Sequence, residues 1–156
     1  MKLTEHFDLE EFELDGKAPE ATIPMYTVLC HNLLEPLRIK FGIPIVVTSG
    51  YRSPTDNEHA HGVRNSQHVA TADYCAADFK FKDDTANWCL MAFDWLREQT
   101  NLVWDQLILE HELSGGSILH LSVTKTVNRR AALEGDTANR SAYVTHPVAA
   151  FSSSTA

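Results

Sequence analysis

The sequence predicts an α+β fold in which helices pack on one face of a small, largely antiparallel sheet. Two observations support this prediction. Helical patterns dominate the N-terminal part of the chain, and short strand patterns follow with one further helical pattern between them. A Ser-Gly-Gly turn at residues 114–116 separates the last two strand patterns, which favours an antiparallel hairpin.

Apolar residues at helical spacing indicate three helical segments. The predicted helices cover residues 9–14, 24–41 and 85–99. Asp8 and Asp84 precede the first and the third of these segments and are suitable N-caps. Gly42 suits the position just after the second segment. Pro36 lies inside that second segment, so we expect it to kink the helix or to divide it in two.

The predicted strands are short and apolar, and they cover residues 45–48, 76–81, 106–110 and 118–123. Successive side chains of a strand point to opposite faces of the sheet. In the last strand the leucines of Leu119-His120-Leu121 therefore face one way, and His120 shares the other face with Ser122. We expect the face that carries His120 to border a cleft.

The length of 156 residues suits one domain. We assign residues 1–133 to this domain and residues 134–156 to a C-terminal extension. The extension ends in a segment rich in Ser and Ala, so we expect it to be partly flexible.

Charge and hydropathy exclude two classes of partner. The net charge of −8 argues against a nucleic acid bound to a basic face. No apolar run approaches the roughly 18 residues that span a membrane. No apolar segment follows the N-terminal positive charge, so we expect synthesis in the cytoplasm without a secretory signal. The three cysteines are Cys30, Cys75 and Cys89, which we interpret as buried, reduced side chains.

Three residues are candidates for metal ligands. His68 lies in a loop-rich segment, and His120 lies inside an apolar strand, where it is either a core histidine or a ligand. Asp78 has small and apolar neighbours, and a buried carboxylate needs an ion-pair partner or a metal. Zinc accepts His nitrogen and Asp oxygen, and catalytic zinc sites have three protein ligands and one open position.

Two charged residues are candidates for catalysis. Arg52 follows a buried strand and is either a surface arginine in a turn or a cation that polarises a substrate carbonyl. Glu110 ends a strand that should lie beside His120. It is either a solvated strand end or a general base that accepts a proton from an attacking water.

Five motifs in one order make a more specific pattern than any of these residues alone. They are LTEHFDLEEF at 3–12, LCHNLLEPLR at 29–38, SGYRSP at 49–54, NSQH at 65–68, and the pair DQLILE and LHLS within 105–122. In these motifs the chain resembles the zinc D-Ala-D-Ala carboxypeptidase family, which includes VanX and VanY types with a hedgehog-like fold and phage endolysins. The likeness extends over about residues 3–133 and is greatest to the small bacterial and phage branch.

The resemblance implies that His68, Asp78 and His120 bind Zn²⁺. In the family the first histidine and the aspartate usually lie closer together, with a glycine between them. Here nine residues separate His68 from Asp78 and none of them is glycine, so Asp73 is an alternative ligand. We favour Asp78 because the Ala-Ala-Asp-Phe context matches the family motif.

The resemblance also implies roles around the metal. Arg52 would stabilise the oxyanion of the tetrahedral intermediate, and Glu110 would be the catalytic base, with Glu112 as a second candidate. The residues expected to contact the substrate are Ser66, Gln67 and Tyr51.

The resemblance implies that the protein is a phage-encoded zinc metallopeptidase, which hydrolyses peptidoglycan stem or cross-bridge peptides. It would be either a D-Ala-D-Ala carboxypeptidase or an endolysin-type endopeptidase that reaches the cell wall after phage lysis or delivery. The alternative function is that of a phage virion protein that keeps the peptidase fold, and the metal with it, for assembly with virion neighbours.

Overall fold

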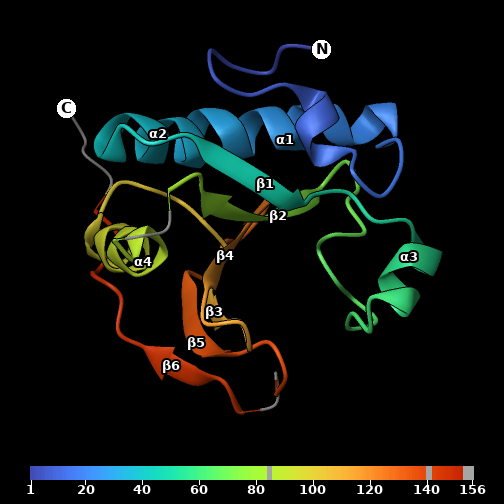
Figure 1. Ribbon diagram of the computed structural model, residues 1–156. Coiled ribbons are helices and arrows are strands. Elements are labelled where there is room, and N and C mark those ends of the chain that lie inside the picture. Colours follow the sequence, from blue (N-terminus) through green and yellow to red (C-terminus); the bar gives the residue numbers. More distant parts are fainter. Residues whose placement is uncertain (84–85, 140–141, 153–156) are drawn as a thin grey trace.

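The computed structural model describes residues 1–83, 86–139 and 142–152. It contains a six-stranded sheet with the order β1-β2-β4-β3-β5-β6, covered on one side by α1, α2 and α4, whereas α3 lies apart from the sheet (Figure 1). The strands are β1 Ile45–Ser49, β2 Tyr74–Phe81, β3 Gln106–His111, β4 Ser117–Thr124, β5 Ala131–Asp136 and β6 Val144–His146. The α-helices are α1 Ile23–Leu29, α2 Glu35–Phe41, α3 Pro54–His59 and α4 Trp88–Glu98. None of the helices in the described part of the chain is long and apolar enough to cross a membrane.

The long N-terminal helical segment forms as one rod of three pieces (Figure 1). A π-helix, η3 Cys30–Leu34, connects α1 to α2, and Pro36 lies in the first turn of α2. Because proline has no amide hydrogen to donate, the change in hydrogen-bond pattern occurs just before it. Gly42 ends the rod in the left-handed conformation, with φ 68°.

The other predicted helices are shorter than expected. Residues 9–14 form only a 3₁₀ turn, η1 Leu9–Phe12, whose buried residues are Leu9 and Phe12. The helix expected from residue 85 begins only at Trp88, as α4, and Asn87 is the residue at its N-cap. Residues 84 and 85, with Asp84 as the predicted N-cap, lie outside the described residues.

The core lies between the helices and one face of the sheet. Side chains of α1 and α4 form one buried cluster with alternate residues of β2, β3 and β4. On β4 these residues are Leu119, Leu121 and Val123, which are at most 2% exposed. The residues between them, His120 and Ser122, therefore face the opposite side, as the alternation of the strand predicts.

Most of the sheet is antiparallel, but β3 and β5 pair in parallel, so the sheet is mixed. The sequence analysis did not predict β5 or β6. The β5 sequence, Ala-Ala-Leu-Glu-Gly-Asp, has no β-branched residue, and Ala132 is its one buried side chain. This strand depends on backbone pairing with β3 on one side and β6 on the other.

The predicted domain boundary at residue 133 falls inside β5. Residues 134–136 and 144–146 thus belong to strands of the same sheet, and the sheet continues into the segment that we assigned to an extension. Beyond β6, the amide of Ala149 donates to the Arg97 carbonyl and that of Ser152 to the Thr100 carbonyl. Residues 153–156, where partial flexibility was expected, lie outside the described residues.

Candidate metal centre

Strand pairing brings two of the three candidate ligands together. Asp78 of β2 and His120 of β4 are direct partners in the antiparallel register. Both lie on the face of the sheet opposite the helices. A register slip of one residue would turn His120 toward the core, so the alternating leucines of β4 also determine where this histidine points.

His68 reaches the same point from the loop before β2. Its Nδ1 donates a hydrogen bond of 2.8 Å to the Gly50 carbonyl, and its own carbonyl accepts from the Arg52 amide at 2.9 Å. Because the carbonyl of Gly50 can only accept, Nδ1 carries a proton, which leaves Nε2 as the nitrogen of His68 that can bind a metal. A hydrogen bond from the ring nitrogen that does not bind the metal orients histidine ligands in metal sites.

Gly50 is required for this support. A Cβ atom at residue 50 would lie 2.4 Å from the Phe12 carbonyl oxygen. The amide of Tyr51 donates to the same oxygen at 2.8 Å. The η1 turn and the end of β1 therefore touch backbone to backbone, and this close contact determines where the Gly50 carbonyl meets His68.

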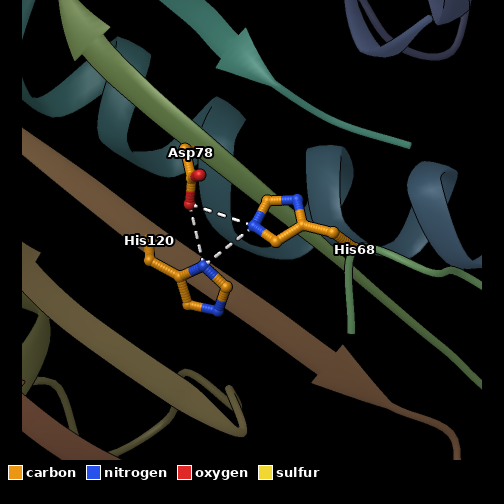
Figure 2. Close-up of side chains that lie close together, drawn as sticks. All are labelled: His68, Asp78 and His120. Carbon is orange, nitrogen blue, oxygen red and sulfur yellow. Dashed lines mark hydrogen bonds and ion pairs between the residues drawn. The ribbon is translucent and has the colours of Figure 1, made fainter. Parts of the chain in front are cut away.

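Three ligand atoms converge at the centre (Figure 2). His68 Nε2 lies 3.1 Å from Asp78 Oδ1 and 3.2 Å from His120 Nδ1, and the last two atoms are 2.8 Å apart. Donors bound tetrahedrally at about 2.0–2.1 Å from a zinc ion would be separated by roughly 3.3 Å. The observed triangle is close to that size, and imidazole nitrogen and carboxylate oxygen are atoms that zinc accepts as ligands, so the residues fit a metal.

The Asp78 carboxylate is ionised in this setting. Burial alone would raise its pKa, but the nearby His68 and the hydrogen bonds with both histidines outweigh burial and lower the pKa well below its ordinary value. Arg52 Nη2 binds the second oxygen, Oδ2, at 3.2 Å, while Arg52 Nε donates to Ser49 Oγ at 2.8 Å. Oδ1 is therefore the oxygen that faces the histidines.

The centre lies in the wall of a cavity of about 710 Å³. Among the predicted residues, those that line it are Arg52, Ser66, Gln67, His68, Asp78, Glu110 and His120. Glu110 reaches it from β3, two residues beyond Ile108, the partner of His120 in the sheet. The structure does not bring Tyr51 to this wall, because its side chain packs against the hydrophobic core.

The two alternative acids lie elsewhere. Asp73 is exposed in the turn before β2, where its carbonyl accepts from the Lys125 amide. Glu112 lies in the turn after β3 and forms an ion pair with Lys80. The geometry thus favours Asp78 over Asp73 as a ligand, and Glu110 over Glu112 as the acid in the cavity wall.

One wall of the cavity was not predicted from the sequence. Arg129, Leu133 and Tyr143 line it, and all three come from the last part of the sheet or the loop before it. A Cβ at Gly135 would lie 2.1 Å from the Tyr143 ring, so the glycine makes room for this ring. The parallel β3–β5 pairing places these residues beside the centre, and no local sequence pattern indicated that pairing.

A family model described as Peptidase M15 matches residues 5–102, which is more than half of the chain. The matched span contains Arg52, His68 and Asp78, whereas Glu110 and His120 lie beyond it. No curated protein matches the chain.

Proposed function

Because this chain belongs to the peptidase M15 family, whose members are metal-dependent, we propose that it is a zinc peptidase that cleaves peptidoglycan stem or cross-bridge peptides. The observation that carries the proposal is the triangle of His68 Nε2, Asp78 Oδ1 and His120 Nδ1 in the wall of a large cavity. Two imidazoles and one carboxylate are a ligand set that suits zinc and leaves a position open.

Zinc bound there would lower the pKa of a water to about 7 and polarise the scissile carbonyl. In our proposal Glu110 accepts a proton on its carboxylate and returns it to the leaving amine. Its place in the cavity wall, on the strand next to His120, supports this role.

Arg52 has two functions in the proposal. Its Nη2 and Nε bind Asp78 and Ser49, which orients the carboxylate ligand. Its Nη1 has no hydrogen-bond partner among the residues that the structure describes, and the side chain lines the cavity. This nitrogen would donate to the negatively charged oxygen that develops on the substrate carbonyl.

The proposal of a cell-wall substrate is supported by the resemblance of the five sequence motifs to those of D-Ala-D-Ala carboxypeptidases and phage endolysins. A D-Ala-D-Ala carboxypeptidase and an endolysin-type endopeptidase share this chemistry and differ in the substrate beyond the scissile bond. We place the enzyme at the bacterial cell wall and propose a phage as its source.

The test combines metal analysis with digestion of purified peptidoglycan. We expect the wild type to bind one zinc and to release peptides or free D-alanine, and His120→Ala to lose both properties. Glu110→Gln should keep the zinc and lose activity by about 10²–10⁴-fold. Glu112→Gln, the matched control outside the cavity wall, should keep both. Full zinc content in His120→Ala, or full activity in Glu110→Gln, would refute the assigned roles.

A further inference from the structure

The cavity has a second arginine, and we propose that the Arg129 guanidinium recognises a carboxylate group of the peptide substrate. This inference rests on the proposed peptidase function and adds to it the residue that would bind a substrate carboxylate near the scissile bond. Arg129 lines the same cavity as His120 and Glu110.

Arg129 is fixed in place by a buried acid. Asp105 is 2% exposed, and its Oδ1 accepts from the Arg129 amide at 2.8 Å and from Nε at 3.0 Å. Its Oδ2 accepts from Arg129 Nη2 at 2.6 Å and from Gln67 Nε2 at 3.0 Å. A guanidinium with its backbone and two of its nitrogens bound in this way loses little further entropy when it binds a ligand.

The remaining nitrogen of Arg129 is available. Nη1 has no hydrogen-bond acceptor in the described part of the chain, and the Arg129 side chain is 58% exposed. Arg52, the other arginine in the cavity wall, is only 11% exposed and binds the metal-ligand candidate Asp78. The two arginines therefore differ in position, since Arg52 is buried beside the centre and Arg129 is open to an incoming molecule.

A carboxylate is the ligand that this site fits. Arginine offers donors only, in a planar arrangement that matches a carboxylate. The chain has a net charge of −8, so its surface as a whole offers no electrostatic attraction to an acidic peptide. Binding of such a peptide therefore needs a local cation. Peptides carry a carboxylate either at the C-terminus or on an acidic side chain, and the two sources share the same chemistry.

The experiment crosses variants of the protein with variants of the ligand. The ligands are a peptide ending in a free D-Ala-D-Ala acid, its C-terminal amide, and an amidated peptide with an internal glutamate. The dissociation constant of each is measured by calorimetry on the metal-free protein, and kcat/KM is measured on the zinc form. Arg130→Met is the matched control, because the Arg130 guanidinium instead binds the Ala149 and Gln99 carbonyls.

We expect Arg129→Met to weaken binding of a carboxylate peptide by about 10- to 100-fold, as for a lost charged hydrogen bond, and binding of the plain amide by less than about twofold. The loss of affinity should appear with the free-acid peptide if Arg129 binds the C-terminal carboxylate. It should appear with the glutamate peptide if Arg129 binds a side-chain carboxylate. Arg130→Met should leave this selectivity unchanged. If the methionine variant does not fold, Arg129→Lys keeps a cation beside Asp105 but lacks the planar donors of arginine, and it should show a smaller loss with the same selectivity for carboxylate peptides.

The inference would be overturned if Arg129→Met lost the same affinity for all three peptides, or if the wild type bound none of them. Selective binding without any hydrolysis by the zinc form would instead contradict the proposed peptidase function and leave carboxylate recognition standing.

Discussion

At the scale of single residues, the candidate metal centre depends on groups that bind no metal. The Gly50 carbonyl fixes the ring of His68, and Arg52 fixes the carboxylate of Asp78. These contacts make His68 and Asp78 each present one chosen atom to the centre. The sequence predicted the ligands themselves from their context, whereas the supporting atoms are backbone or distant side chains that no motif reveals.

Replacement of Gly50 by alanine tests this support. The added Cβ would lie 2.4 Å from the Phe12 carbonyl oxygen, so the backbone must shift and the bond to His68 Nδ1 must weaken. We expect a loss of stability of about 1–3 kcal/mol. We also expect zinc affinity to fall by about 10- to 100-fold, as when a second-shell partner is lost. Denaturant unfolding and chelator competition measure the two effects.

The control for this prediction is Thr48→Ala, which alters an exposed residue of β1 close to Gly50. It should change stability by no more than about 0.5 kcal/mol and leave zinc affinity unchanged. Normal zinc affinity in Gly50→Ala would show that His68 does not need the Gly50 carbonyl.

At the scale of elements, the sequence predicted the parts of the sheet that have a strong pattern of their own. The four apolar strands β1–β4 occur where they were expected, because their alternation matches one buried face. The strands β5 and β6 were missed, since they bury little and depend on pairing with neighbours distant in the sequence. Arg129 and Tyr143 were missed as cavity residues for the same reason.

Glu134 connects three of these strands, which predicts a pH dependence. Its carboxylate pairs with His111 of β3 at 2.8 Å and with His146 of β6 at 2.6 Å. The hydrogen bond from His111, together with the charge of His146, outweighs burial and lowers the Glu134 pKa below its ordinary value near 4.5. Because the folded pKa is lowered, the stability contributed by this group is present above pH 4.5 and lost as the pH falls through the folded pKa.

We therefore expect Glu134→Gln to reduce stability at pH 7 by about 1 kcal/mol or less, and to reduce the loss of stability between pH 5 and about pH 3. The free energy of unfolding, measured by urea titration across this range, checks the prediction. Glu58→Gln, which alters an exposed side chain of α3, is the control and should follow the wild type. An unchanged pH slope in Glu134→Gln would show that the bridge contributes nothing.

At the scale of the whole molecule, the helices and the centre occupy opposite faces of one sheet. The hydrophobic core on the helical face stabilises the sheet, and the sheet in turn holds two histidines and a carboxylate close together on its other face. Asp78 and His120 lie between core residues of their own strands, so the centre forms only when β2 and β4 are paired. Metal binding must therefore be coupled to folding, because an unfolded chain does not bring these atoms together.

This coupling predicts a shift in thermal unfolding. Zinc at about 100 times its dissociation constant should add about 2.7 kcal/mol of stability, which corresponds to a rise of roughly 5–11 °C in Tm for a chain of this size. Calorimetry of the protein with and without zinc measures the shift. His120→Ala should abolish it by removing one ligand, whereas His59→Ala, at an exposed histidine of α3, should preserve it. If zinc raises the Tm of His120→Ala as much as that of the wild type, the metal binds elsewhere, and the triangle of His68, Asp78 and His120 must owe its geometry to protons shared among its own side chains.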